Sequence, residues 1–413
     1  MKQLTFLILF NLPFLTTAQN LTQSEKLYGL SVAWEKAKTN FAYFDQIEQD
    51  WDKMYQQNIE AVLTTQNTKE YYDILIKMYA QLNEGHTWIW YPDEINNNLN
   101  TIPIQTSLLE NKVIITDIFN DSLKDQLSIG DEILKINGMN VMDYGKEKIM
   151  PFVSASTPQD RLLRTYSYDL FLGDIHQAVQ LEIKEHKSAK IKTLTISREM
   201  EQFFNFGQPY QYKKLKKNIG YLRINSFYVN NYKETFDSLY PMIQQNQALI
   251  LDLRTNGGGS GIQAHYVLSH FLSSPTLTAQ YQLRKRVEDE WEQFPSDTLY
   301  PQKDKEVYTK PIALLIGTGT FSAAEDFCVA FDNAKRGLKV GSKTAGSTGN
   351  SIEFDLPGGG YGQVTFKRDT YPNGKEFVGY GIEADVVVHQ TIKDFLKGTD
   401  TVLEKAIEVI NQQ

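Results

Sequence analysis

The sequence predicts a multidomain protein of mixed α+β and α/β architecture, because its secondary-structure signals change character twice along the chain. Residues 24–82 carry aromatic side chains at helical spacing among charged ones. Residues 102–196 are dominated by short β-like runs, and from residue 217 onward apolar strands alternate with helical patterns. Such alternation is typical of a largely parallel sheet that helices cover. We therefore expect a helical subdomain at 19–98, a β-rich domain at 99–200 and an α/β core at 210–413.

Residues 1–18 predict a secretory signal. They contain Lys2, a mostly apolar run from Leu4 to Leu15, and then small residues up to Ala18. A retained membrane anchor is the alternative, but the run is shorter than the roughly 20 apolar residues that span a bilayer. We expect the mature chain to begin at Gln19, to reach a periplasm or the medium, and to keep no stable membrane insertion.

Composition narrows the classes of partner. The 413 residues carry a formal net charge of -8, and no sustained run of Lys or Arg is present. Nucleic acid and anionic membrane surfaces are therefore not expected as partners. Cys328 is the only cysteine, so no intrachain disulfide can form and stability must come from the hydrophobic core.

The N-terminal half contains signals for helix packing and for turns. Aromatic residues such as Trp51 and Tyr79 predict the buried faces of helices rather than a ligand site. In the β-rich domain, Lys112–Ile115 and Asp131–Ile136 predict strands. The second strand ends in Asn137-Gly138, a pair typical of tight hairpin turns.

Ser322 is the candidate nucleophile. It follows the apolar strand Ile312–Ile316 and precedes the helical segment Ala323–Phe331, so it should lie at a tight turn beside free helix N–H groups. A second buried strand, Ala248–Leu253, runs into the glycines Gly257–Gly259. Glycine lets backbone amides approach a ligand closely, so this run predicts further donors for an oxyanion.

A serine needs a base, and His86 has the most constrained setting among the six histidines. It follows Gly85, where a helix is expected to stop, although a turn histidine with no catalytic role is the alternative. A carboxylate that orients the imidazole could come from Glu383 or Asp385, which could equally cap a turn. Glu325 is expected to support the serine turn rather than to act as base. The remaining histidines are expected to have no catalytic role: His176, His186, His265, His270 and His389.

Residues 127–138 resemble the central signature of PDZ domains, and the surrounding strands fit one domain of that size at 99–200. The resemblance implies that a peptide C-terminus could add a strand beside a helix. An unrelated β insertion is the alternative. The usual carboxylate-binding loop is not evident in the sequence.

Nearly the whole mature chain resembles the tail-specific, or C-terminal processing, peptidases and their tricorn-core relatives. The resemblance implies a serine protease core with a ClpP/crotonase-like α/β fold. Its motifs, in chain order, are Leu-Asn-Glu-Gly-His-Thr, the PDZ-like insertion, Ile-Leu-Asp-Leu-Arg-Thr-Asn-Gly-Gly-Gly, Ser-Ala-Ala-Glu, Lys-Thr-Ala-Gly and Gly-Ile-Glu-Ala-Asp.

The resemblance also implies roles for single residues. Ser322 matches the family's nucleophile, and the oxyanion donors would be the N–H of Ala323 and that of Gly257 or Gly258. One branch of the family pairs the serine with a lysine, but Ser347 occupies that position here and Lys343 falls too early. The histidine branch is therefore favoured.

In the histidine branch, His86 would be the general base and Glu383 the supporting carboxylate. The tricorn core has a serine immediately before its histidine, whereas this chain has Gly85, so Thr87 or a water is an alternative bridge to the carboxylate.

The resulting expectation is a secreted serine endopeptidase that acts on polypeptides, including their C-terminal segments, with no metal or organic cofactor. Two other functions stay open from the sequence. One is a catalytically silent protein that binds peptides through the PDZ-like domain, and the other is a serine hydrolase for a non-peptide acyl substrate. The sequence does not indicate an oligomeric state.

Overall fold

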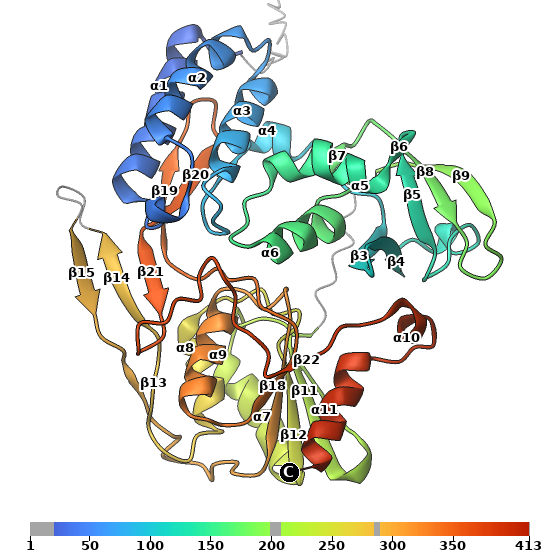
Figure 1. The fold of residues 1–413 in the computed structure, drawn as a ribbon, viewed down its shortest axis with the longest axis vertical. Coiled ribbons are helices and arrows are strands. Elements are labelled where there is room, and N and C mark those ends of the chain that lie inside the picture. Colours follow the sequence, from blue (N-terminus) through green and yellow to red (C-terminus); the bar gives the residue numbers. More distant parts are fainter. Residues whose placement is uncertain (1–19, 199–207, 285–289, 413) are drawn as a thin grey trace, which may run out of the picture.

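A computed structural model describes residues 20–198, 208–284 and 290–412. The expected secretory signal at 1–18 lies outside the described residues. Figure 1 shows three groups of elements: N-terminal helices, a β-rich domain beside them, and an α/β core that contains the C-terminal half of the chain. The expected mixed α+β and α/β fold class is confirmed.

The α/β core is built on a six-stranded sheet of order β10-β11-β12-β17-β18-β22. Only β10 is antiparallel to its neighbour, so the sheet is largely parallel, as predicted. Its central strands are continuous apolar runs because both faces are buried. The strands are β10 (Tyr210–Lys214), β11 (Ile219–Ile224), β12 (Ala248–Asp252), β17 (Ile312–Ile316), β18 (Leu338–Gly341) and β22 (Val386–Val387).

Helices cover both faces of this sheet. Alternate residues of β12 and β17 pack into two hydrophobic clusters, with Leu251 and Leu314 on one face and Ile250 and Leu315 on the other. The first face is covered by α7 (Tyr232–Gln244), α8 (Gly261–Ser269) and α9 (Ala323–Asn333), and the second by α11 (Thr401–Asn411). This packing fixes the N-terminus of α9 at the carboxyl edge of β17.

The N-terminal helices share their hydrophobic cluster with the α/β core. Buried residues such as Leu30 and Tyr79 belong to the same cluster as Phe327 of α9. The helices lie beside a three-stranded sheet of order β1-β20-β19, which joins the N-terminal region to the C-terminal half of the chain (Figure 1). These elements are α1 (Gln23–Asn40), α2 (Trp51–Thr64), α3 (Thr68–Ala80), β1 (Trp88–Trp90), β19 (Ser351–Asp355) and β20 (Tyr361–Thr365).

The β-rich domain has a hydrophobic cluster of its own, which includes Val113, Ile133 and Leu181. The predicted turn is present, since Asn137 and Gly138 both have positive φ, at 49° and 83°, between β5 and β6. The sheet contains β3 (Ile104–Leu109), β4 (Lys112–Ile118), β5 (Glu132–Ile136), β6 (Met139–Asn140), β8 (Val179–Lys184) and β9 (Ile191–Ile196). Two helices, α5 (Val141–Tyr144) and α6 (Pro158–Leu163), lie between β6 and β8 in the chain.

The remaining α-helices and strands are short. They are α4 (Asp93–Asn96), α10 (Ile392–Leu396), β2 (Leu99–Asn100), β7 (Gly173–Asp174), β13 (Thr276–Leu277), β14 (Gln280–Arg284), β15 (Trp291–Phe294), β16 (Thr298–Leu299) and β21 (Lys367–Thr370). Within residues 20–198, 208–284 and 290–412, no helix has both the length and the apolar character that a membrane span requires.

Candidate active site

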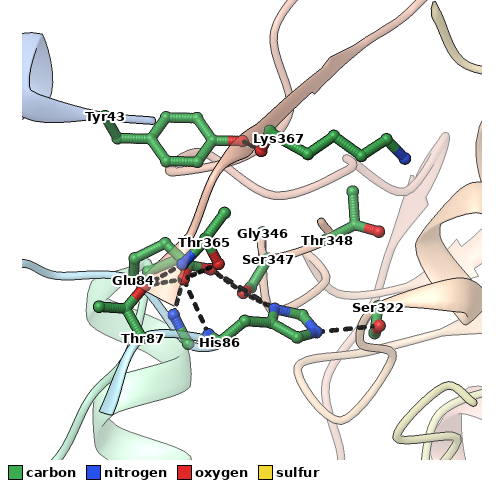
Figure 2. A network of polar contacts seen from close by, with 12 residues as sticks. Tyr43, Glu84, His86, Thr87, Ser322, Gly346, Ser347, Thr348, Thr365 and Lys367 are labelled. Carbon is green, nitrogen blue, oxygen red and sulfur yellow. Dashed lines mark hydrogen bonds and ion pairs between the residues drawn. The ribbon is translucent and has the colours of Figure 1, made fainter. Parts of the chain in front are cut away.

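The fold brings His86 and Ser322 together, although 236 positions separate them in the chain. The Nε2 atom of His86 lies 3.0 Å from the hydroxyl oxygen of Ser322 (Figure 2). His86 comes from the turn between α3 and β1, and Ser322 from the turn between β17 and α9. The juxtaposition expected from the sequence is therefore present.

Ser322 has an unusual backbone conformation, with φ at 58° and ψ at -128°. A non-glycine residue in such a region costs on the order of 1–3 kcal/mol, so the surrounding structure must hold it there. The N–H of Ser322 donates to the carbonyl oxygen of Ser347 at 2.9 Å, and its own carbonyl accepts from Glu325 at 2.7 Å. This sharp turn directs the hydroxyl away from the end of β17 and toward His86.

Two of the three predicted oxyanion donors are available. Ala323 is the first residue of α9, so its N–H has no partner within the helix. Gly257 is exposed and an added Cβ there would meet no atom within 4 Å, whereas a Cβ at Gly258 would lie 2.7 Å from the Cβ of Ser322. The N–H of Gly258, however, donates to Asn256 Oδ1 at 2.8 Å. The geometry therefore favours the N–H groups of Ala323 and Gly257 as oxyanion donors. The absence of a side chain at Gly258 leaves room for Ser322.

A second serine and a buried carboxylate stand behind His86. The Nδ1 atom of His86 lies 3.0 Å from the hydroxyl oxygen of Ser347, and this hydroxyl donates to Glu84 Oε1 at 2.8 Å (Figure 2). Because the Ser347 proton is directed to Glu84, its oxygen must accept from Nδ1–H. The Nε2 atom is then unprotonated and can accept the proton of Ser322.

Glu84 is held by several donors at once. Its Oε2 atom accepts from the hydroxyls of Thr87 and Thr365, at 2.8 and 2.7 Å, and from the N–H of His86 at 2.9 Å. Burial acts to raise the pKa of Glu84, but hydrogen bonds and the charge of His86 together lower it to about 2. The group is therefore a carboxylate at neutral pH.

Glu383, the carboxylate predicted to support His86, does not reach it. Its side chain is 68% exposed and forms an ion pair with Lys343 at 2.9 Å. This pair also removes Lys343 from consideration as the base. The expectation for Glu383 is thus corrected: the carboxylate nearest to the imidazole is Glu84, which lies two positions before His86 in the same turn.

Thr87 was an alternative bridge to the carboxylate, but its hydroxyl contacts Glu84 rather than the ring of His86. The bridging group is Ser347. The sequence contains a signal for Glu84, as a glutamate within the histidine turn, and one for Ser347, as a serine at the position of the lysine in the other branch.

Gly85 allows the close approach of these groups. A Cβ at this position would lie 2.8 Å from the hydroxyl oxygen of Ser347 and 2.9 Å from the ring of Phe321. The helix before it, α3, ends at Ala80 and not at Gly85 as expected, and Asn83, with φ at 51°, lies in the turn that follows. The ring of His86 stacks on Phe321, with centroids 4.6 Å apart and an angle of 17° between the planes, which restricts its rotation.

Glu325 was expected to support the turn of Ser322; its side chain holds the loop that carries Ser347, whose carbonyl accepts from the N–H of Ser322. Its carboxyl oxygens accept from the N–H groups of Gly346 and Ser347, both at 2.8 Å, and from the hydroxyl of Thr344. Burial raises the pKa of Glu325 to about 8, so the carboxyl is largely protonated at neutral pH.

A segment of the β-rich domain contacts two loops of the site. Gly85 N–H donates to the hydroxyl of Ser156 at 2.9 Å. The hydroxyl of Thr157 donates to the carbonyl oxygen of Ala345 at 2.8 Å. The side-chain amide of Gln159 donates to the carbonyl oxygen of Thr344 at 3.0 Å. The loops that carry His86 and Ser347 are therefore both attached to this segment.

Three of the histidines that were not expected to be catalytic have structural contacts or buried positions. His186 pairs with Asp131 at 3.0 Å, and His270 is fully buried. Burial lowers the pKa of His265. In the part of the chain that the structure describes, no group of three or more His, Cys, Asp or Glu residues is arranged to hold a metal ion.

Comparison with known proteins relates part of the chain to a peptidase family. Residues 218–388, which contain β11 to β22 and Ser322, match the model of peptidase family S41. The chain therefore contains a segment that matches peptidase family S41. The predicted resemblance and the assignment as a serine-type peptidase, a hydrolase, are confirmed.

Curated relatives match most of the length of this chain. It is 23% identical over 392 residues to the carboxyl-terminal-processing protease of Synechocystis sp., covering 92% of this chain and 84% of that protein. It is 23% identical over 373 residues to the chloroplastic carboxyl-terminal-processing peptidase 1 of Arabidopsis thaliana, covering 86% and 70%.

Solved structures share the fold of this chain. Mature CPAF complexed with lactacystin matches with a TM-score of 0.74 and 16% identity, over 95% of this chain and 99% of the other. The photosystem II D1 C-terminal processing protease matches with a TM-score of 0.54 and 18% identity, over 88% and 93%. At these identities the likeness establishes the architecture.

Proposed function

We propose that the protein is a serine endopeptidase in which Ser322 is the nucleophile and His86 the general base. The observation that carries the proposal is the continuous chain of contacts from Ser322 through His86 and Ser347 to Glu84, with separations of 3.0, 3.0 and 2.8 Å. This order of donors and acceptors is the one that serine activation requires.

The proposed reaction begins when Ser322 Oγ attacks the peptide carbonyl and its proton moves to Nε2 of His86. The carbonyl electrons move onto oxygen, and the N–H groups of Ala323 and Gly257 stabilise that charge. The imidazolium then protonates the leaving amine as the C–N bond breaks. Water hydrolyses the acyl-enzyme by the same steps in reverse order, with His86 again accepting a proton.

Ser347 and Glu84 are proposed as positioning residues. Ser347 accepts a hydrogen bond from the Nδ1–H group, which fixes the tautomer of His86. The ionised Glu84 stabilises the imidazolium through the bridging hydroxyl. Neither residue touches the substrate.

We propose polypeptides as substrates, cut within unstructured or C-terminal segments. The names of the curated relatives, which describe carboxyl-terminal processing, support this substrate class. The β-rich domain is proposed as the PDZ-like module that presents the chain, because it has its own core and the predicted hairpin. Its edge strand β3 contacts the segment that follows α6, where Thr106 Oγ1 donates to the carbonyl of Tyr166 at 2.6 Å.

Export through residues 1–18 is proposed on the sequence pattern alone. N-terminal sequencing of the protein recovered outside the cytoplasm should begin at Gln19. Recovery of a chain that still begins at Met1 would contradict the proposal.

Active-site labelling with a fluorophosphonate tests the catalytic assignment. Wild type should be labelled, Ser322→Ala should not, and His86→Ala should be labelled slowly because the serine lacks its base. Labelling of Glu383→Gln should match wild type. Failure to label wild type would favour the catalytically silent alternative, and turnover of small acyl esters without cleavage of unfolded protein would favour the non-peptide alternative.

A further inference from the structure

The outward face of the β1-β20-β19 sheet is rich in aromatic residues. Side chains alternate along β1, so Ile89 is buried while Trp88 and Trp90 point the other way. Trp90 is 41% exposed. The ring of Trp88 lies 5.5 Å from that of Trp90 and 5.6 Å from that of Tyr361 on β20, both edge to face. Three aromatic rings thus form one continuous group.

This group begins next to the catalytic turn. Trp88 follows His86 by two positions, and its partner in the sheet is Gln363. The side-chain amide of Gln363 donates to the carbonyl oxygen of His86 at 2.8 Å. The sheet face therefore adjoins the turn that carries His86.

Two unpaired carboxylates lie on the same face. Glu353 is paired in register with Gln363, and Asp355 with Tyr361, so their side chains share the outward side of the sheet. Both are exposed. Neither makes an ion pair or a side-chain hydrogen bond with any residue that the structure describes, whereas most acidic side chains near the site are engaged.

We infer that this surface, defined by Trp88, Trp90, Tyr361, Glu353 and Asp355 and called the aromatic face, binds a segment of the polypeptide substrate that carries arginine or lysine. The inference rests on the proposed function. Guanidinium and ammonium groups stack on indole and phenol rings, and carboxylates beside the rings favour a cation over a neutral side chain. The rings alone would accept any apolar residue, so the carboxylates supply the charge preference.

The position of the aromatic face beside the turn of His86 favours the polypeptide substrate as the molecule that binds there. Indole rings supply contact area without long flexible side chains, which suits the capture of an extended chain. The overall charge of -8 attracts basic segments at longer range. Binding at this face would raise the local concentration of the scissile bond at Ser322.

Binding is tested with the full-length Ser322→Ala variant, which holds peptide without cutting it. The probe is a fluorescent, unstructured arginine-rich peptide, and its counterpart has citrulline in place of arginine. The arginine peptide should bind more tightly, and Trp90→Ala should weaken it roughly fivefold. Glu353→Gln with Asp355→Asn should abolish the preference for arginine over citrulline. The matched controls, Trp291→Ala and Glu292→Gln with Asp304→Asn, alter exposed residues elsewhere and should bind as the parent does.

Cleavage separates failure of this inference from failure of the proposed function. With active Ser322, Trp90→Ala should raise KM for the arginine-rich substrate and leave fluorophosphonate labelling unchanged. If wild type labels and cleaves but the face variants bind and cut both peptides as wild type does, the aromatic face is not a substrate site while the peptidase assignment stands. A change in sedimentation caused by Trp90→Ala, with peptide binding intact, would instead show that a second copy of the chain covers the face.

Discussion

A hydroxyl group stands between the imidazole of His86 and the carboxylate of Glu84. Because a hydroxyl is both donor and acceptor, Ser347 can fix the orientation of the ring while the carboxylate acts from a second position. The nearest separation of His86 Nδ1 and Glu84 Oε1 is 3.5 Å, so the charge of the carboxylate still acts on the imidazolium.

Replacing Ser347 by alanine should lower kcat by roughly 10- to 100-fold with little change in KM, because the Nδ1 proton loses its acceptor and the tautomer is no longer fixed. The measurements are steady-state cleavage of an unfolded protein and the pH profile of kcat/KM. Thr348→Ala is the matched control, since this neighbouring hydroxyl contacts Asp326 rather than His86. Equal activity of the two variants would show that the bridge is not used.

Glu325 should make the protein less stable as the pH rises. Its pKa is raised by burial from the ordinary value of 4.5 to about 8 in the folded state, so its contribution is complete below about 4.5 and is lost as the pH passes through about 8. Chemical denaturation between pH 5 and pH 9 measures this. Glu325→Gln should be less stable at low pH but should show a smaller decline over the range, and a parallel decline in the two proteins would contradict the assignment.

The sequence predicts His86 and Ser322 because each occupies a turn with a recognisable local pattern. The supporting carboxylate is different. Glu84 and Glu383 both lie in motifs with glycine neighbours, and only the folded chain shows that one is buried against Ser347 and the other is paired with Lys343 in solvent. Local pattern alone does not report such long-range burial.

At the scale of elements, α6 and the residues before it connect the β-rich domain to the site. Thr157 caps α6 through its hydroxyl oxygen, which accepts from Asp160 N–H, and it also donates to the carbonyl of Ala345. One side chain therefore caps the start of a helix and anchors the loop that carries Ser347.

Thr157→Val should lower kcat roughly tenfold and the free energy of unfolding by about 1–3 kcal/mol, because it leaves a buried carbonyl and a helix N-terminus without a partner. Thr165→Val is the control: this hydroxyl is also buried in the same domain but makes no hydrogen bond. The control should be neutral or stabilising. The kinetic and denaturation measurements must differ between the two valine variants for the anchoring role to stand.

Elements with strong local signals were predictable, and those made by distant pairing were not. The strand Ile312–Ile316, the helix that follows Ser322 and the Asn137-Gly138 hairpin all appear as expected. The pairing of β1 with β20 joins residues more than 270 positions apart. Its three-residue strand has no periodicity long enough to identify it, since register depends on the partner.

For the whole molecule, the shared hydrophobic cluster makes the N-terminal helices and the α/β core depend on each other. Leu30, Tyr79 and Phe327 belong to one cluster, whereas Ile133 and Leu181 belong to the separate cluster of the β-rich domain. Burial of apolar surface is the main favourable contribution to folding, so a cut through one cluster removes more stability than a cut between two.

A fragment of residues 99–198 should therefore unfold cooperatively on its own, and a fragment of residues 208–412 should not. Thermal denaturation followed by circular dichroism, together with the binding of a dye for exposed apolar surface, measures the difference. Co-expression of the second fragment with residues 20–98 should restore part of its cooperativity. A cooperative transition in residues 208–412 alone would show that the helices are a separate unit.

The separation of the imidazole and the hydroxyl along the chain makes assembly of the site depend on folding. Synthesis delivers His86 early and Ser322 and Ser347 late, so a chain that has not yet folded lacks the assembled chain of hydrogen bonds. In the proposed mechanism, hydrolysis therefore requires that the turn carrying His86 has folded against the C-terminal half of the chain.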